Sequence, residues 1–239
     1  MKAWVLHGIG DLRLEEREEK ALLDEEVLVA VKAAGICGSD IPRCYQTGAH
    51  THPLILGHEF AGKVVKLGAK ADKSWLGQRV GVFPLLPCKE CIPCQKKQYE
   101  MCQHYSYLGS RQDGGFAEYV TVPVWNLLPL PEEVTYEEAA MLEPMAVAVH
   151  AMRRMLPNKD MGAAVHATGK MAISDRENLP DEELLCKIAV CGLGTIGLLL
   201  LMFLKEAGVR EVYAIGNKDF QKELALKLGI EYREGFIKN

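Results

Sequence analysis

The sequence contains 239 residues, of which 49% are hydrophobic and 25% charged, and its formal net charge is −4 at pH 7. This composition is typical of a globular protein and argues against a disordered or fibrous chain, while the slightly acidic balance argues against nucleic acid as a partner. The longest apolar run, near residues 195–204, is shorter than the roughly 20 residues that span a bilayer, so we predict no membrane partner.

Residues 2–131 form short segments of alternating apolar and polar side chains, separated by glycine and proline; EEVLVAVKAAG and HEFAGKVVKLGA are examples. Segments of this kind predict a barrel-like all-β domain whose loops carry the function. The first residues show neither the apolar stretch nor the cleavage site of a secretory signal. We therefore predict a cytoplasmic protein with reduced thiols.

Four of the eight cysteines fall within PCKECIPCQKKQYEMC, at residues 87–102. In a reducing compartment such a cluster is more typical of metal binding than of disulfides, although incidental or bridged cysteines are the alternative. Four thiolates complete the tetrahedral coordination of zinc and leave no open position, so the predicted site is structural. Its predicted ligands are Cys88, Cys91, Cys94 and Cys102.

A second, mixed set of possible metal ligands is spread over separate segments. It comprises Cys37 in GICGSD, His58 and Glu59 in GHEF, and Glu143 in MLEPM. A thiolate, an imidazole and a carboxylate can bind zinc and leave a fourth position for water or an alcohol oxygen, as a catalytic zinc requires. Each residue alone also has an ordinary explanation: a small core cysteine, a structural histidine, or a glutamate that complements a helix dipole.

The pattern changes after the predicted β domain. Residues 131–156 have apolar side chains at helical spacing, and from about residue 187 the order strand, glycine turn, helix, strand, helix predicts the start of a doubly wound α/β unit. We therefore predict a catalytic domain at 1–156, a connecting segment with an insertion at 157–186, and a partial dinucleotide-binding domain at 187–239. The insertion, rich in Gly, Ser, Asp and Asn, is predicted to be a surface excursion.

GLGTIG at residues 192–197 matches the dinucleotide fingerprint G-x-G-x-x-G between a predicted strand and a predicted helix. Gly192 permits the tight turn, Gly194 lets the backbone approach a pyrophosphate, and Gly197 lets the helix pack on the strand. Thr195 and Ile196 complete the candidate coenzyme-binding turn. A glycine-rich turn without a ligand is the alternative.

The end of the next predicted strand bears on the choice of coenzyme. An acidic residue about 20 positions after the fingerprint holds the adenosine ribose of NAD. Here that position is Gly216, and Lys218 follows. The sequence therefore favours NADP slightly over NAD, although an exposed lysine is usually solvated surface.

Together these motifs resemble the medium-chain zinc-dependent alcohol and polyol dehydrogenases. GICGSD, LILGHEFAG, the four-cysteine segment and DGGFAEYV occur in that family's order, and GAHTHPLILGHEF and GSRQDGGFAEY are similar to its galactitol-1-phosphate 5-dehydrogenase branch. The resemblance implies an N-terminal GroES-like β-barrel catalytic domain followed by the first half of a Rossmann nucleotide-binding domain. It also implies one catalytic and one structural zinc, NAD or NADP, a polyol or polyol phosphate as small-molecule substrate, and a homo-oligomer, dimer or tetramer.

The resemblance assigns roles to individual residues of the catalytic zinc site. Cys37, His58 and a glutamate, either Glu59 or Glu143, would surround the zinc. Ser39 would accept the proton of the substrate, and Asp40 would orient the ligands around it.

Other positions bear on the proton path and the substrate. Many relatives have a histidine that continues the proton relay where this chain has Pro42, so another proton exit is expected. A phosphorylated substrate requires a cationic anchor, for which Arg43 and Arg111 are candidates, although both are equally compatible with an ordinary surface role.

Relatives in this family continue beyond the position of Asn239 and complete the nicotinamide side of the coenzyme site. We therefore expect the chain as written to bind NAD(P) weakly and to show little dehydrogenase activity, with both zinc sites filled. The alternative function is a catalytically silent zinc-binding remnant that acts as a folding or interaction unit.

Overall fold

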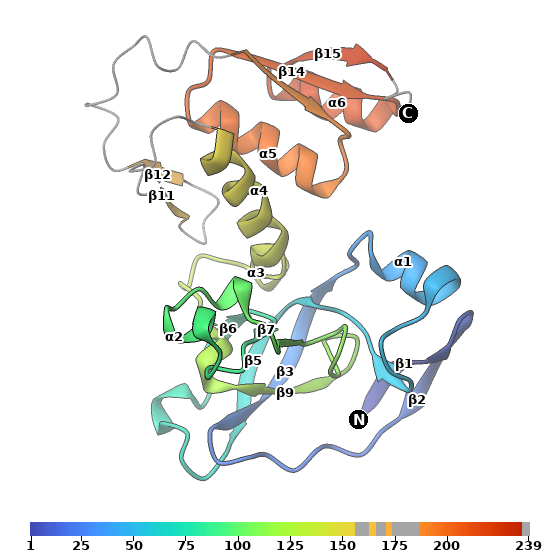
Figure 1. The fold of residues 1–239 in the computed structure, drawn as a ribbon, viewed down its shortest axis with the longest axis vertical. Coiled ribbons are helices and arrows are strands. Elements are labelled where there is room, and N and C mark those ends of the chain that lie inside the picture. Colours follow the sequence, from blue (N-terminus) through green and yellow to red (C-terminus); the bar gives the residue numbers. More distant parts are fainter. Residues whose placement is uncertain (156–162, 166–170, 174–186, 236–239) are drawn as a thin grey trace. The chain divides into compact units, whose positions relative to one another are not determined.

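The computed structural model describes residues 1–155, 163–165, 171–173 and 187–235. The chain forms two compact units, Met1–Glu143 and Pro144–Asn239 (Figure 1). Among the described residues no helix is long and apolar enough to cross a membrane. The domain limits at residues 156 and 187 stay a prediction.

The N-terminal unit is built on a five-stranded antiparallel sheet in the order β10-β6-β5-β3-β9. A three-stranded sheet, β2-β1-β4, and a two-stranded pair, β7-β8, complete it. The strands are β1 Lys2–Gly8, β2 Asp11–Glu16, β3 Glu26–Gly35, β4 Leu54–Ile55, β5 Glu59–Leu67, β6 Arg79–Val82, β7 Leu85–Leu86, β8 Ser106–Tyr107, β9 Tyr119–Pro123 and β10 Leu127–Pro129.

Valines supply most of the core of this sheet. They recur at alternate positions of single strands, as Val27 and Val29 on β3 and Val120 and Val122 on β9, so that they project from one face. All are at most 3% exposed and pack with Phe60. The alternating pattern therefore predicted the strands, and the all-β expectation for this part of the chain is confirmed.

Short helices join these strands. They are α1 Asp40–Pro42, η1 Arg43–Thr47, η2 Lys73–Trp75, α2 Ile92–Gln95, η3 Tyr99–Met101 and η4 Val124–Asn126. The helical pattern predicted at 131–156 becomes two helices, α3 Tyr136–Ala140 and α4 Leu142–Met155. The first begins later than predicted because Thr135 and Glu138 form a capping box that fixes its start.

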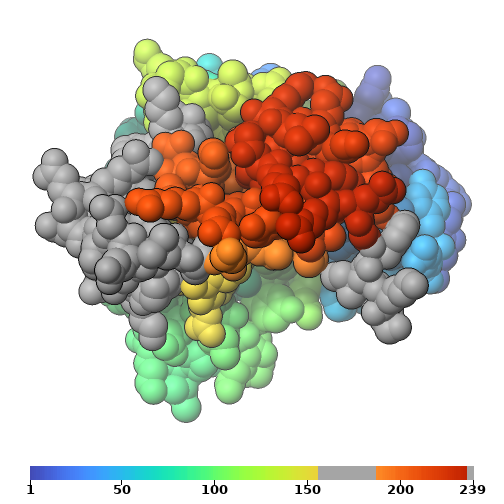
Figure 2. Space-filling view, turned by 90° about the horizontal axis from the view of Figure 1, so that it is seen from above, coloured from blue at the N-terminus to red at the C-terminus, as the bar shows by residue number. Residues whose placement is uncertain are grey.

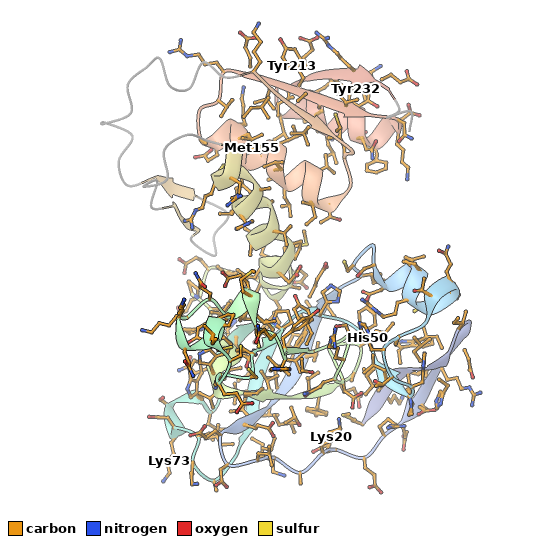
Figure 3. The ribbon with its side chains drawn as sticks, viewed as in Figure 1. Lys20, His50, Lys73, Met155, Tyr213 and Tyr232 are labelled. Carbon is orange, nitrogen blue, oxygen red and sulfur yellow. The ribbon has the colours of Figure 1, made fainter. Side chains whose placement is uncertain are left out.

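The C-terminal unit contains a parallel sheet in the order β13-β14-β15, formed by Lys187–Cys191, Glu211–Gly216 and Glu231–Glu234. Helices α5 Thr195–Glu206 and α6 Asp219–Lys227 connect these strands. Figure 2 shows residues 187–235 as a continuous orange-to-red body, and Figure 3 labels Tyr213 and Tyr232 on β14 and β15. The expected first half of a Rossmann fold is confirmed, with β15 as a third strand that the sequence pattern did not show.

Most of the predicted insertion at residues 158–186 lies outside the described residues. Its two described pieces form an antiparallel hairpin, β11 Ala163–Val165 and β12 Met171–Ile173.

Candidate zinc and coenzyme sites

A buried aspartate fixes the loop that follows β3. Asp40 is 2% exposed, and its Oδ2 accepts a hydrogen bond of 3.0 Å from the backbone N–H of Cys37. Its Oδ1 accepts from Arg43 Nη1 at 2.9 Å. This carboxylate therefore holds the backbone of Cys37 in place and has its own charge neutralised by Arg43.

The pairing of β3 with β5 brings the mixed set of side chains together. Gly35, at the end of β3, pairs with Glu59, at the start of β5. A Cβ at Gly35 would collide with Glu59 Oε2, so the missing side chain leaves room for the carboxylate. One ligand atom each from Cys37, His58 and Glu59 lies within 4.8 Å of the others. The structure thus assembles a thiol, an imidazole and a carboxyl that the sequence places on two segments.

The electrostatics of this group fit a bound cation. His58 and Glu59 are 6% and 5% exposed, and His58 Nδ1 has no hydrogen-bond partner among the described residues. Asp40 Oδ1 lies 3.8 Å from that nitrogen. Burial, and to a smaller extent Glu143, raises the pKa of Glu59. A divalent ion would offset the cost of burying these carboxylates, and the donor set is one that zinc accepts.

Glu143, the other glutamate considered for the zinc, makes a different contact. Its Oε1 accepts a hydrogen bond of 3.0 Å from the hydroxyl of Tyr107, and it does not join the compact group of ligand atoms. The Tyr107 ring meets His58 edge-on, with centroids 5.9 Å apart. Burial, together with the charge of Glu143, raises the pKa of Tyr107 and keeps it a hydrogen-bond donor.

Tyr107 is a site residue that the sequence did not reveal. It lies on β8, two residues long, and no motif spacing links it to His58 or Glu143. A tyrosine shortly after the four-cysteine segment gives no signal that separates it from its neighbour Tyr105. Only the pairing of β7 with β8 places it beside the histidine.

Ser39 lies beside the group, on its solvent side. Its hydroxyl donates to Cys37 Sγ at 3.3 Å, and the residue is exposed. Pro42 ends the three-residue helix α1 and contributes no polar side chain. The serine is therefore adjacent to the thiol and in contact with water.

The two candidate phosphate anchors differ in their partners. Arg43 is engaged by Asp40, and its side chain is 19% exposed. Arg111 is exposed and stacks on Tyr105, with its Cζ 4.6 Å from the ring centroid. Within the described residues Arg111 makes no ion pair, so its charge is the freer of the two.

The four-cysteine segment folds into a compact lobe around α2 and η3. The thiols of Cys88, Cys91, Cys94 and Cys102 all lie within 4.8 Å of one another. Cys88 Sγ and Cys94 Sγ are 4.0 Å apart, and Cys91 Sγ and Cys102 Sγ 3.9 Å. These separations are far from the ~2.05 Å of a disulfide. They are close to the ~3.8 Å edge of a tetrahedron with zinc–sulfur bonds of ~2.3 Å.

Backbone N–H groups of the lobe donate hydrogen bonds to the cysteine sulfur atoms. The N–H of Cys88 donates to Cys102 Sγ at 3.2 Å, and the N–H of Cys91 donates to Cys88 Sγ at 3.4 Å. Lys89, at φ 64°, holds the turn between them in the left-handed region, which non-glycine residues seldom adopt. Sulfur atoms that accept backbone hydrogen bonds and lie at these separations fit a closed four-thiolate zinc site.

The glycine turn lines a groove of the C-terminal unit. The groove has a volume of about 280 Å³ and is lined by the turn at 191–194 and by Ile215, Gly216, Asn217, Gln221 and Gly235. Gly192 has φ +88°, and a Cβ at Gly197 would collide with Gly192 O. The structure thus brings the fingerprint and the end of β14 together. Lys218 is the residue before α6, makes no capping hydrogen bond with its side chain, and is exposed.

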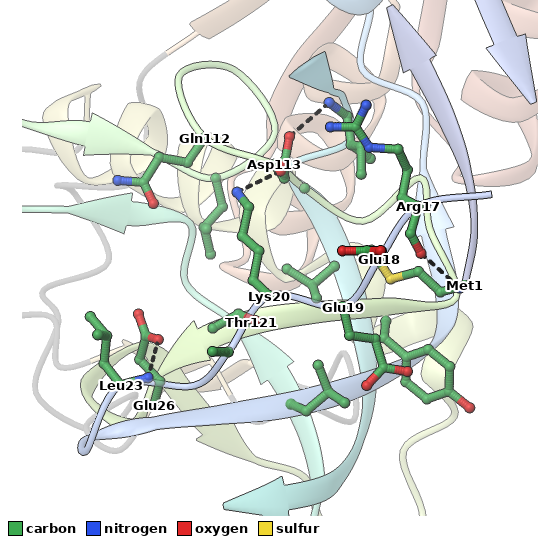
Figure 4. A pocket seen from close by; sticks show the side chains of 17 residues that line it. Met1, Arg17, Glu18, Glu19, Lys20, Leu23, Glu26, Gln112, Asp113 and Thr121 are labelled. Atoms are coloured by element: carbon green, nitrogen blue, oxygen red, sulfur yellow. Dashed lines mark hydrogen bonds and ion pairs between the residues drawn. The ribbon is translucent and has the colours of Figure 1, made fainter. Parts of the chain in front are cut away.

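A separate cavity of about 240 Å³ lies in the N-terminal unit (Figure 4). An ion pair between Lys20 and Asp113, 2.6 Å apart, lies at its wall. None of its lining residues belongs to either cysteine-containing group, so it is distinct from the candidate metal sites.

Comparisons with known proteins found a matching domain model and similar proteins. Residues 23–132 match the model of the alcohol dehydrogenase GroES-like domain. The chain is 35% identical over 207 residues to galactitol 1-phosphate 5-dehydrogenase of Escherichia coli K12, covering 86% of this chain and 52% of the relative. It is 36% identical over 211 residues to D-arabitol-phosphate dehydrogenase of Enterococcus avium, covering 87% and 53%.

A solved structure extends the match to the C-terminal unit. A zinc-binding dehydrogenase from Sinorhizobium meliloti 1021, described as putative and bound to NADP, superposes with a TM-score of 0.80 and 27% identity, covering 98% of this chain and 61% of the other. The chain spans about half the length of the curated relatives it matches.

Proposed function

We propose, from the match of residues 23–132 to the alcohol dehydrogenase GroES-like domain, that the protein is a zinc-dependent dehydrogenase of polyols or polyol phosphates. Its reaction would transfer a hydride from a secondary alcohol to NAD(P). The observation that carries the proposal is the meeting of Cys37, His58 and Glu59 within 4.8 Å, beside an exposed serine. The matched relatives are named dehydrogenases, which favours an enzyme over a silent remnant.

Cys37, His58 and Glu59 would hold the catalytic zinc, and Asp40 would position the cysteine through the hydrogen bond to its backbone N–H. Bound zinc supplies a Lewis acid that lowers the pKa of the substrate hydroxyl. Of the two glutamates, we assign Glu59 as the ligand because its carboxylate belongs to the compact group. Glu143, held by Tyr107, remains at the edge of the site.

Ser39 would take up the proton of the substrate hydroxyl. Its position next to Cys37 Sγ puts it within reach of an oxygen bound beside that sulfur. Because Ser39 is exposed, its own hydroxyl proton would pass to water as its oxygen accepts the proton of the substrate. That direct exit replaces the relay that Pro42 cannot continue.

The groove at the glycine turn would bind the pyrophosphate and adenosine part of the coenzyme, at Gly192, Gly194, Thr195, Ile196 and Gly197. Free backbone N–H groups at the start of α5 point to anionic oxygens in such folds. The nicotinamide ring supplies the hydride acceptor.

A phosphorylated polyol is the substrate class we favour, since two matched relatives are named for polyol phosphates. Arg111 is the better candidate for the phosphate because Arg43 already neutralises Asp40. The second zinc, at Cys88, Cys91, Cys94 and Cys102, would be structural. A cytoplasmic location and a homo-oligomer stay predictions.

Metal analysis and cobalt spectroscopy test this proposal without relying on turnover. The purified chain should contain two zinc ions, Cys37→Ser one, and Cys191→Ser, an exposed cysteine outside both groups, two. With Co²⁺ in the catalytic site, galactitol 1-phosphate should perturb the visible ligand-field bands. Arg111→Ala should weaken that response and Arg111→Lys should largely retain it. Two zinc ions in Cys37→Ser, or bands that no polyol or polyol phosphate perturbs, would contradict the proposal.

A further inference from the structure

The segment DGGFAEYV, residues 113–120, carried part of the family resemblance but has no role in the sites described above. Its backbone runs along residues 55–57, immediately before His58. Three consecutive N–H groups donate to the three carbonyls of that stretch: Gly114 to Ile55 at 2.8 Å, Gly115 to Gly57 at 2.7 Å and Phe116 to Leu56 at 2.9 Å. The DGGFAEYV segment therefore holds the part of the chain that leads to the histidine.

Two glycines let the chain around this segment approach His58 closely. Gly109 has φ +76°, and a Cβ there would collide with Gly57 O and lie 2.7 Å from the backbone nitrogen of His58. A Cβ at Gly114 would also collide with Gly57 O. The two backbones are therefore in direct contact, and in a close-packed interior a shift of one requires a shift of the other.

Asp113 adds a side-chain contact to this packing. Its Oδ1 accepts a hydrogen bond of 3.1 Å from the backbone N–H of Ile55, and its Oδ2 lies 2.6 Å from Lys20 Nζ (Figure 4). The Lys20 side chain is 67% exposed, so this ion pair contributes little stability. The bond to the backbone N–H is charge-assisted and has a defined geometry. Asp113 therefore acts mainly on the backbone of Ile55.

The imidazole of His58 depends on its backbone for its position. A metal-binding histidine usually donates its second ring N–H to a fixed acceptor, which orients the ring. Here Nδ1 has no hydrogen-bond partner among the described residues, and Asp40 Oδ1, at 3.8 Å, is too far away to be one. Tyr107 meets the ring edge-on. Packing and the backbone contacts therefore set the position of the imidazole.

We propose that Asp113 is a positioning residue for His58. By binding the N–H of Ile55, it keeps the chain before the histidine against the DGGFAEYV segment and so sets the place of the imidazole relative to Cys37 and Glu59. Asp113 is outside the compact ligand group and acts through the backbone. The proposal rests on the proposed function, because it requires zinc at Cys37, His58 and Glu59.

Competition with a zinc chelator tests this role without relying on turnover. In Asp113→Ala the site at Cys37, His58 and Glu59 should bind zinc about tenfold more weakly, at the lower end of the 10–100-fold cost of losing an outer contact of a metal ligand. Zinc binding by the four-cysteine lobe should not change. With Co²⁺ in the first site, the visible ligand-field bands should shift, because the imidazole is no longer held in place.

Three variants separate the hydrogen bond from the charge. Asp113→Asn keeps an oxygen acceptor for Ile55 and should bind zinc like the unchanged chain. Lys20→Met removes only the ion pair and should do the same. Asp113→Glu keeps the charge but moves the carboxylate by one methylene, so it should bind zinc more weakly than Asp113→Asn. The comparison of Asp113→Glu with Asp113→Asn decides the question if Asp113→Ala does not fold.

Asp72→Ala is the matched control for a general loss of stability. Asp72 is exposed, its Oδ1 accepts from the backbone N–H of Ser74 at 2.8 Å, and it belongs to neither metal group. Its replacement removes a hydrogen bond of the same kind and should lower the melting temperature. Zinc affinity and the cobalt bands should stay unchanged in this variant.

The remaining outcomes separate this inference from the proposed function. Unchanged zinc affinity and cobalt bands in Asp113→Ala, or equal losses in Asp113→Ala and Asp72→Ala, would overturn the positioning role and leave the proposed function standing. The same holds if Asp113→Asn binds zinc as weakly as Asp113→Ala, or no more tightly than Asp113→Glu. If the unchanged chain binds no zinc at Cys37, His58 and Glu59, this inference and the proposed function are both wrong.

Discussion

Ser39 and Asp40 follow one another in the chain but lie in opposite environments. The serine is exposed, and the aspartate is 2% exposed and holds the backbone N–H of Cys37. One of the two can therefore exchange protons with water, whereas the other is suited to fixing geometry. Their proposed roles, proton acceptor and positioning residue, follow from this difference.

Replacing Ser39 by alanine should reduce turnover by about 10²–10⁴, the usual cost of losing a positioned proton acceptor. Zinc content should not change, because the serine is not among the ligands. Ser39→Thr keeps a hydroxyl and should restore much of the rate. The measurement is steady-state kinetics of an active form, with metal analysis of the same samples, and full activity in Ser39→Ala would remove the serine from the mechanism.

Tyr107→Phe should lower the free energy of unfolding by about 1–2 kcal/mol, because Glu143 loses a hydrogen-bond donor and the ring packing against His58 remains. Tyr105→Phe is the matched control: Tyr105 is exposed and its hydroxyl contact with Arg111 is long, at 3.4 Å. The unfolding free energy of the Tyr105→Phe variant should stay close to that of the unchanged chain. Denaturant titration measures both, and equal effects would show that the buried hydrogen bond contributes little.

At the scale of single elements, α3 shows how a short helix is specified locally. Thr135 Oγ1 accepts from the backbone N–H of Glu138 at 3.1 Å, and Glu138 Oε2 accepts from the backbone N–H of Thr135 at 2.8 Å. Thr135→Ala should cost about 0.5–2 kcal/mol of unfolding free energy, the range of a lost N-cap. Thr51→Ala, at an exposed loop position, is the control and should be nearly neutral in the same thermal or denaturant assay.

The same capping box gives a pH dependence of known sign. The backbone N–H of Thr135, and then its hydroxyl, lower the pKa of Glu138. A depressed folded-state pKa adds stability above the unfolded value, about 4.3, and that stability is lost as the pH falls through the folded value. The stability difference between the unchanged chain and Glu138→Gln should therefore shrink below about pH 4. A difference that grows in acid would have the wrong sign.

The four-cysteine lobe is an element held together by its side chains more than by regular structure. Its helix α2 has four residues, Ile92–Gln95, too short to be stable alone. Cys94→Ser should remove one zinc and lower the melting temperature, because metal binding and folding of such a lobe are coupled. The exposed Cys191→Ser should change neither. Unchanged zinc content in Cys94→Ser would contradict the structural site.

At the scale of the whole molecule, the two proposed zinc sites should differ in how they lose their metal. As proposed, the site at Cys37, His58 and Glu59 would offer three protein ligands and an open position, whereas the four-thiolate site would be closed. A chelator should remove the first zinc early and with little change in circular dichroism. It should remove the second slowly, together with local unfolding, and both losses should quicken in acid because protons compete for the thiols. Simultaneous loss of both metals would argue against this distinction.

The sequence predicted those features that depend on local pattern. Alternating valines predicted the strands, the spacing of the four cysteines predicted their meeting, and GLGTIG predicted the strand–turn–helix. It did not predict Tyr107 beside His58, or Asp113 beside the backbone of Ile55, because both contacts arise from pairing and packing between segments distant in the chain. It also could not separate Glu59 from Glu143, since that choice depends on which strand end faces the cysteine loop.

The pairing of Gly35 with Glu59 makes metal binding depend on the register of β5 against β3. Successive side chains of a strand point to opposite faces, so a slip of β5 by one residue would turn the Glu59 carboxylate away from Cys37 and put a different side chain over the glycine. A chain with this register error could still bind zinc in the four-cysteine lobe, but it would not bind zinc at Cys37, His58 and Glu59. The ratio of zinc to protein in a preparation would then measure the fraction of molecules whose barrel has formed in the correct alignment.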